Sequence, residues 1–244
     1  MWKINKNKNN EIEFVANDKY DFEVCSKPFP ASQAIPKWWK DASPYIKSFE
    51  NPDGKKIIIQ NRNSNASFKK CAPMLDMLSS GYIVPLWADV QIRNINGVPN
   101  LSWRVQRDVF EPHLKQGVET PEGYGDFQFK FINQWTPRLP RGYSALIIPC
   151  PGYPNNVFIP ISAVIDYDKT KHPLSPPMHL KNNFEGIVEK GTPMFQIIPF
   201  KRDNWQSKFS YLEDGEYNMI IDREVKSTLV NNYVKNFWQK KTYK

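Results

Sequence analysis

The sequence contains few of the residues from which common cross-links and reactive sites are built. Its 244 residues include three cysteines, three histidines and 11 glycines. The cysteines, Cys25, Cys71 and Cys150, are odd in number and far apart, with no C-x-x-C pair. This pattern excludes a disulfide framework and offers no zinc-binding spacing, so we expect a protein of a reducing compartment.

Long apolar runs are also missing. No stretch reaches the roughly 18 consecutive apolar residues of a membrane-spanning helix. The first eight residues, MWKINKNK, lack the apolar centre of a signal peptide. We therefore expect no membrane association and a cytoplasmic location.

The signatures of common enzymes are absent as well. The chain has no Walker A loop, no G-x-G-x-x-G, no G-x-S-x-G and no H-E-x-x-H. His113 and His172 lack the nearby carboxylate of an iron(II) oxygenase motif, so we expect no metal site and no cofactor. Cys71 follows Lys69 and Lys70, which favour a thiolate, but an idle thiol is the simpler reading. These absences favour a protein without catalysis.

Charge and aromatic residues are plentiful. The net charge of +8 allows an anionic partner such as nucleic acid, but the basic residues are scattered, which favours a solvated surface. The 34 aromatic residues indicate a folded globule. Six tryptophans would either form a groove that stacks bases or sugars or fill the core of a sheet, and the core is favoured. These residues are Trp38, Trp39, Trp87, Trp103, Trp135 and Trp205.

The pattern predicts one mainly β domain, a β-clip-like fold or β-sandwich of mixed or antiparallel strands. Prolines make residues 1–70 an irregular wrapping segment, with short strands at 12–15, 22–25 and 57–61 and a helical turn at 36–40. The predicted β core spans residues 71–215 and starts with a short helix at 73–79. Its strands are a hairpin around Asn96-Gly97 and segments at 127–131, 144–148, 157–165 and 194–200.

The last part, residues 216–244, is predicted to form an amphipathic helix. Asp222 is a candidate N-cap, and apolar residues from Val225 to Trp238 recur at helical spacing. Packing of this apolar stripe on the sheet is favoured over a partner-binding role.

Several ordered motifs resemble a known family. They include PKWWK at 36–40, KCAPMLD at 70–76, GYIVPLWADV at 81–90, FINQW at 131–135 and GTPMFQIIPFKR at 191–202. Together they are similar to a family of bacterial and tailed-phage proteins, domain of unknown function 6065. The resemblance covers about residues 12–205 and implies a phage source, without implying an activity.

A second, local resemblance concerns the C-terminal half. The segments LPRGY at 139–143, AVIDYD at 163–168 and EKGTPMFQII at 189–198 look like the motif order of deoxyuridine triphosphatases, which are trimeric β-clip proteins. The resemblance implies a catalytic carboxylate at Asp166 and, in this nucleotide reading only, bound magnesium. It implies ligand contacts from four further residues: Arg141 to phosphate, Tyr143, Tyr167 and Asp168.

Without the resemblance, Asp166 and Asp168 have two readings. If both side chains lie on one face of a continuing strand, they would share a proton or bind a cation. If they follow the strand, they would form a solvated turn, and this second interpretation is favoured. The phosphate-binding segments of the triphosphatases are replaced here by PCPG at 149–152 and by the C-terminal helix. We therefore expect a structural, assembly or binding component with protein partners or a homo-oligomer. The alternatives are a deoxynucleotide-binding or hydrolysing protein and a binder of single-stranded nucleic acid or glycan.

Overall fold

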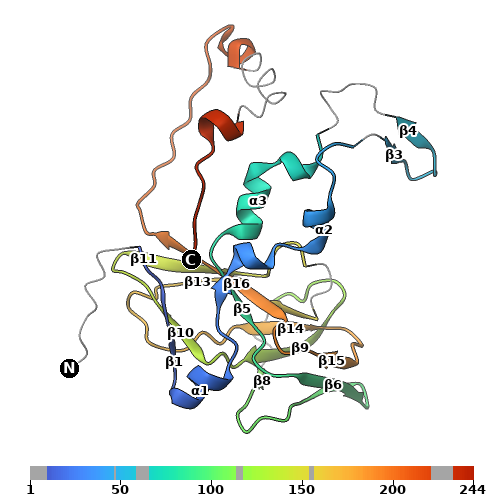
Figure 1. Ribbon diagram of the computed structural model, residues 1–244, viewed down its shortest axis with the longest axis vertical. Helices are drawn as coiled ribbons and strands as arrows, with labels where there is room; N and C mark the ends of the chain where they lie inside the picture. Colours follow the sequence, from blue (N-terminus) through green and yellow to red (C-terminus); the bar gives the residue numbers. More distant parts are fainter. Residues whose placement is uncertain (1–9, 47, 59–65, 114–117, 154–156, 221–232) are drawn as a thin grey trace. The chain divides into compact units, whose positions relative to one another are not determined.

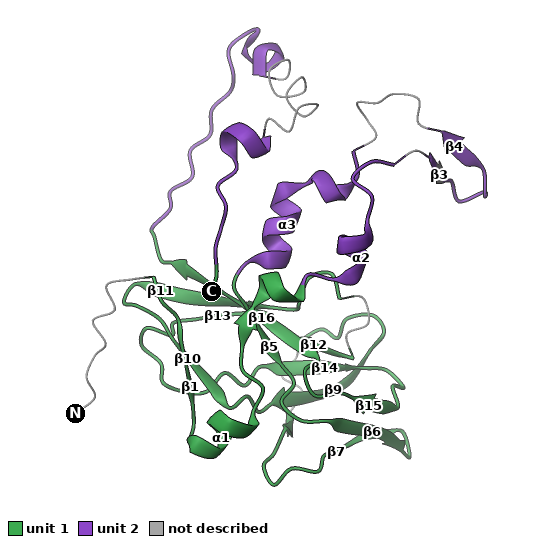
Figure 2. Cartoon of the chain, viewed as in Figure 1, with its two compact units in different colours: residues 1–34, 81–203, 243–244 green, residues 35–80, 204–242 purple. Residues whose placement is uncertain are grey.

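The computed structural model describes residues 10–46, 48–58, 66–113, 118–153, 157–220 and 233–244 (Figure 1). The chain forms two compact units, coloured separately in Figure 2. Unit 1 comprises residues 1–34, 81–203 and 243–244, and unit 2 comprises residues 35–80 and 204–242. The chain thus passes between the units near residues 34, 80, 203 and 242, whereas the sequence suggested boundaries at 70 and 215 in one domain.

Unit 1 is built from antiparallel sheets, which confirms the predicted mainly β fold. Its strands are β1 (Glu13–Ala16), β2 (Phe29–Pro30), β5 (Tyr82–Pro85), β6 (Val90–Ile95), β7 (Val98–Ser102), β8 (Phe110–His113), β9 (Tyr124–Phe131), β10 (Trp135–Arg138), β11 (Tyr143–Ile148), β12 (Phe158–Pro160), β13 (Ala163–Ile165), β14 (Pro177–Lys181), β15 (Gly186–Val188) and β16 (Pro193–Lys201). Two short helices, α1 (Lys19–Val24) and the 3₁₀ turn η1 (Ala31–Ala34), complete it.

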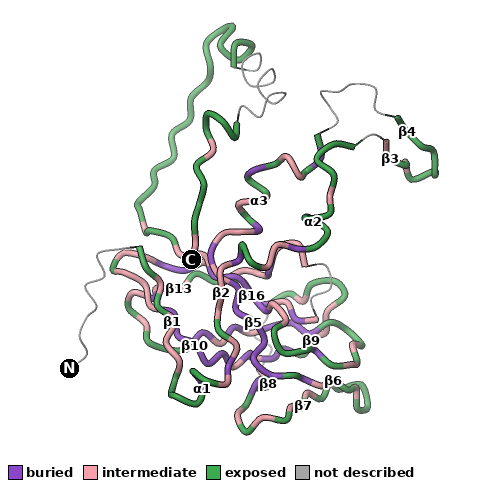
Figure 3. The backbone as a smooth tube through the Cα atoms, in the orientation of Figure 1, coloured by how far each residue is buried: buried purple, intermediate pink, exposed green. Residues whose placement is uncertain are grey.

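Two larger sheets organise unit 1. One has the strand order β13-β11-β16-β5-β2 and the other β12-β14-β9-β8, while β15-β6-β7 and β1-β10 form smaller sheets. Phe131 of β9 meets Phe195 of β16 edge to face, with ring centroids 6.2 Å apart. Both rings are fully buried, as is Trp87, whose indole N–H donates to the Ile132 carbonyl at 2.9 Å. The core therefore lies where the two sheets meet (Figure 3).

The hairpin of β6 and β7 is confirmed at the predicted turn. Asn96 and Gly97 both have positive φ, 54° and 82°, as a two-residue turn with right-handed strand twist requires. The predicted single strand at 157–165 is instead two strands, β12 and β13, which pair in different sheets. The predicted strand at 22–25 is wrong, because Asp18 caps a helix there by accepting from the Asp21 N–H at 2.8 Å.

Unit 2 contains mostly helical turns and one small hairpin. Its elements are α2 (Lys37–Asp41), β3 (Ser48–Glu50), β4 (Lys56–Ile58), the 3₁₀ turn η2 (Phe68–Lys70), α3 (Ala72–Ser79) and the π-helical turn η3 (Tyr233–Phe237). The predicted turn at 36–40 and helix at 73–79 thus match α2 and α3. Trp39 is buried against Trp38 and Phe68, and the Lys69 ammonium donates to the Trp39 carbonyl.

The C-terminal helix prediction lies only partly within the described residues. Residues 216–220 are helical and η3 forms a π-helical turn, while the candidate cap Asp222 and residues up to 232 fall outside the described part. The following segment returns to α3, where Asp76 accepts from the Trp238 indole at 2.9 Å and from Lys241 at 2.6 Å. No helix among the described residues is long and apolar enough to cross a membrane.

Gly81 allows β5 to lie unusually close to β16. Its φ is +69°, and an added Cβ would lie 2.0 Å from the carbonyl oxygen of Ile197. The left-handed backbone disfavours a side chain, and this separation leaves no room for one. The core sheet therefore depends on glycine at this position.

We predict that Gly81→Ala destabilises the protein by more than the roughly 1–2 kcal/mol that a left-handed backbone alone costs. Gly97→Ala is the control, because Gly97 has the same handedness but no atom within 4 Å of an added Cβ. Denaturant unfolding of both variants measures the difference. If both variants lose the same free energy of unfolding, the close approach to Ile197 adds no destabilisation.

Candidate functional site

The predicted carboxylates lie in an ionic cluster at the end of β13. The Arg202 guanidinium, just after β16, donates to both carboxylate oxygens of Asp168, with the Nη1 to Oδ1 distance at 2.9 Å. The same Nη1 lies 3.0 Å from Asp166 Oδ1. Ser144 of β11 donates to Asp166 at 2.6 Å, and the Gly142 N–H donates to Asp168 at 2.9 Å. One guanidinium therefore joins three chain segments.

These contacts favour the ionised forms of the acids. The Arg202 hydrogen bond lowers the pKa of Asp168 below its ordinary value, aided by the Gly142 N–H. The Ser144 hydrogen bond, with the charge of Arg202, lowers the pKa of Asp166. Asp168 in turn raises the pKa of Arg202. The Asp168 side chain is only 3% exposed and the Arg202 side chain is 31% exposed, so the pair is bidentate and partly buried.

The five predicted site residues are only partly brought together. Asp166 and Asp168 share Arg202, and Tyr143 enters the cluster through its backbone carbonyl, which accepts from Arg202 at 2.9 Å. The Tyr143 hydroxyl instead donates to Asn10 at 2.9 Å. Arg141 is exposed and makes no hydrogen bond or ion pair with the described residues.

Arg202 is the residue that sequence reasoning missed. It was visible only as the last letter of a family motif, 34 residues from its partner Asp168. Because the charge of Arg202 is paired with two carboxylates, Arg202 is not available to bind a phosphate. The cluster therefore has the chemistry of a structural joint between β11, β13 and β16.

A cleft opens beside this cluster, and Tyr167 belongs to it. The cleft measures about 600 Å³. Apolar residues and prolines dominate its lining, with a few polar groups among them: Glu111, Lys130, Ile132, Ile147, Ile161, Ala163, Ile165, Tyr167, Thr170, His172, Pro173, Leu174, Ser175, Pro176 and Pro177. Its volume lies within the roughly 300–1,000 Å³ of typical ligand sites.

Tyr167 carries a polar group that the protein leaves unused. The side chain is 3% exposed, and its hydroxyl makes no hydrogen bond with any described residue. Burial alone raises the pKa of Tyr167 above its ordinary value. Because Tyr167 lines the cleft, this hydroxyl is available to a ligand there.

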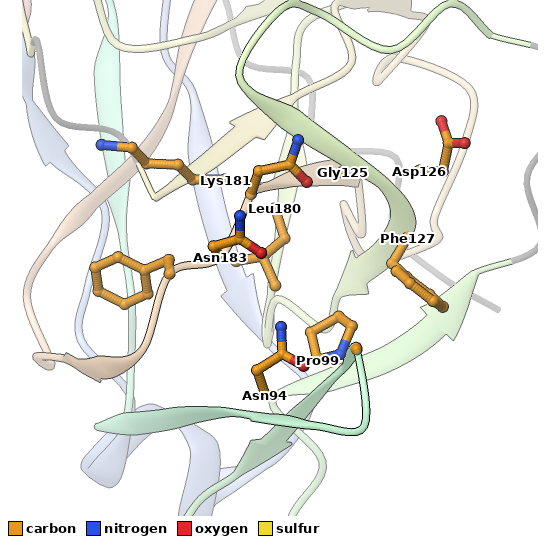
Figure 4. A pocket seen from close by; sticks show the side chains of 11 residues that line it. Asn94, Pro99, Gly125, Asp126, Phe127, Leu180, Lys181 and Asn183 are labelled. Carbon is orange, nitrogen blue, oxygen red and sulfur yellow. The ribbon is translucent and has the colours of Figure 1, made fainter.

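A second pocket is much smaller (Figure 4). It measures about 110 Å³ and lies between the β6–β7 hairpin, which supplies Asn94 and Pro99, and the segment that supplies Leu180 and Asn183. A drug-sized ligand needs roughly 300 Å³ or more, so we assign no binding role to this pocket.

The other reactive groups are structurally engaged or isolated. Burial raises the pKa of the Cys25 thiol to about 11 and that of Cys150 to about 12, so neither is a nucleophile near neutral pH. Cys71 is exposed. Buried Asp21 pairs with Arg107 at 3.3 Å. Among the described residues, no three His, Cys, Asp or Glu side chains are grouped to hold a metal ion.

The most exposed apolar segment is in unit 2, and we call residues 204–220 the arm. Its large apolar side chains are unusually open to solvent: Trp205 90%, Phe209 92%, Tyr211 86%, Leu212 50%, Tyr217 62%, Met219 68% and Ile220 43%. The tube in Figure 3 shows the arm as an exposed stretch. Trp39, Trp87 and Trp135 are buried, so the core reading holds for them but not for Trp205.

No protein-family model matches this chain, and no curated protein matches it. We therefore infer function from the arm, the cleft and the ionic cluster.

We predict that Asp168→Asn lowers the free energy of unfolding by about 2 kcal/mol at neutral pH, the cost of weakening charged hydrogen bonds. Because the pKa of Asp168 is lowered by folding, its contribution is present above the ordinary value of 3.8 and is lost as pH falls through the lower folded pKa. The difference in the free energy of unfolding between the wild type and the variant should therefore disappear in acid.

Asp203→Asn is the control, because Asp203 pairs with Lys201 at 3.3 Å on an exposed surface. We expect it to change stability by no more than about 0.5 kcal/mol. Urea unfolding across a pH series measures both variants. A loss of unfolding free energy in Asp168→Asn that does not change with pH would contradict a charge-based role for the pair.

Proposed function

We propose that this chain is a non-catalytic assembly protein whose copies associate through the arm. The observation that carries the proposal is the exposure of the arm's aromatic side chains. Trp205, Phe209 and Tyr211 are each at least 86% exposed in the isolated chain. Apolar side chains concentrated in this way on a surface mark a site of association.

The arm is large enough to form an interface. Its seven large apolar side chains would bury roughly 800–1,000 Å² when covered, given about 150–250 Å² for each aromatic residue. A standard protein interface buries about 800 Å² on each partner. The arm alone therefore supplies enough surface for a specific complex.

The first part of the arm, residues 204–212, has backbone groups that are open to a partner. Residues 203–213 have no regular secondary structure, and no backbone group of residues 204–212 bonds to another described residue. Such a segment is suited to pairing with an edge strand of another molecule. This supports a protein partner over a small-molecule substrate.

The ionic cluster supports a role without catalysis. In the nucleotide reading, Asp166 is the catalytic carboxylate, but it accepts from Ser144 and faces Arg202 at 3.0 Å. A carboxylate held in this way has a lowered pKa and is a weak general base. On the basis of the family resemblance, we further propose that such an assembly component belongs to a tailed phage, in the host cytoplasm or in the virion.

We predict that the purified wild type associates as its concentration rises, while the arm variant, Trp205→Ser with Phe209→Ser and Tyr211→Ser, stays a monomer of about 28.5 kDa. These side chains make few contacts in the isolated chain, so the variant should keep its melting temperature. Sedimentation velocity at several concentrations measures the association.

The control replaces two exposed apolar residues of unit 1, Val164→Ser and Ile187→Ser, which are 60% and 62% exposed. This variant should associate like the wild type. A wild type that remains monomeric, or an arm variant that associates equally well, would refute the proposal.

A further inference from the structure

We propose that the arm of one copy docks into the cleft of unit 1 of a second copy. This inference rests on the proposed self-association and names the surface that receives the arm. The same chain would then carry both a donor segment and an acceptor site. Four observations connect the two.

The first observation is the spacing of the arm's aromatic residues. Trp205, Phe209 and Tyr211 are separated by even numbers of residues, with polar Gln206, Lys208 and Ser210 between them. In an extended segment, residues at even spacing project from the same face. The arm therefore presents three aromatic rings on one side when it lies along a surface as a strand.

The second observation is the shape and chemistry of the cleft. Its volume of about 600 Å³ is large enough for aromatic side chains, and its lining is mainly aliphatic residues and proline. Ala163 and Ile165 of β13 line the cleft, while Val164 between them is not among the lining residues. An apolar cleft of this kind gains stability when aromatic rings displace water from it.

The third observation is an unused edge beside the cleft. Strand β13 is the last strand of the five-stranded sheet, and no strand in the described part of the chain pairs with its outer side. A segment that adds to this edge would gain backbone hydrogen bonds. The Tyr167 hydroxyl, which lines the cleft and makes no hydrogen bond with any described residue, would donate to a backbone carbonyl of the same segment.

The fourth observation is complementary charge. The loop that borders the cleft carries Lys169 and Lys171, while Glu213, Asp214 and Glu216 follow the arm's aromatic residues. The Lys169 side chain is 72% exposed, and its long, exposed contact with Asp166, at 4.0 Å, leaves the ammonium open to a further carboxylate. Opposite charges at the rim favour the docked orientation and steer association.

An interface of arm to cleft joins two different surfaces. Each copy therefore offers one arm and one cleft, and association continues until a ring closes or a reciprocal dimer satisfies both sites. We therefore expect that one variant can lose only the arm and another only the cleft, and that the two variants can still bind each other when they are mixed.

The decisive experiment uses two full-length variants that fail in different ways. The arm variant defined above keeps an intact cleft. The cleft variant, Ala163→Trp, keeps an intact arm, and its new side chain lies at an exposed position on the cleft wall. We expect each variant alone to be monomeric, and an equimolar mixture to form a 1:1 heterodimer and nothing larger, measured by sedimentation velocity.

Val164→Trp is the matched control, because Val164 lies on the opposite face of the same strand and is 60% exposed. It should assemble like the wild type. Tyr167→Phe removes only the hydroxyl, so it should weaken association about fivefold, the value of one hydrogen bond, without lowering the melting temperature. This variant tests the cleft even if Ala163→Trp folds poorly.

The outcomes separate the two proposals. If the arm variant is monomeric but Ala163→Trp and Tyr167→Phe both assemble normally, the arm docks elsewhere and only the acceptor assignment fails. If the mixture of the two variants gives no heterodimer, the assignment also fails. A monomeric wild type would overturn both proposals, leaving the arm for a different protein partner.

Discussion

The position of the cleft depends on the partly buried ion pair between Arg202 and Asp168. This pair connects the end of β16 to the loop after β13, and the Gly142 N–H completes the joint. The flanking residue Tyr167 belongs to the buried core cluster, and Thr170 and residues 172–177 of the following segment line the cleft. The charged, bidentate hydrogen bonds to the shielded Asp168 carboxylate stabilise this joint.

Local features were predictable from the sequence. The Asn96-Gly97 turn and the helix before Gly81 depend on residues within one turn of each other, so their patterns are readable. The segment at 22–25 was misread because its apolar spacing fits a strand, while the decisive contact is the cap from Asp18. Residues 157–165 were read as one strand because periodicity does not reveal which sheet each half joins.

Contacts between residues far apart in the chain could not be predicted from the sequence. Nothing near β1 identifies β10 as its partner, and the pairing of Asp168 with Arg202 joins residues 34 positions apart. Asp166 and Asp168 were recognised as a pair, but the guanidinium that neutralises them was not. The even spacing of Trp205, Phe209 and Tyr211 was present in the sequence, yet its meaning depends on their exposure.

The pairing of β5 with β16 brings together segments more than a hundred residues apart. Folds rich in such distant contacts form slowly, because chain entropy is lost before the contacts form. During that delay the aromatic arm is already exposed, while the cleft, built from β9, β11 and β13, does not yet exist. If the arm docks as proposed, a newly synthesised chain exposes its apolar arm before the docking site exists, which favours aggregation.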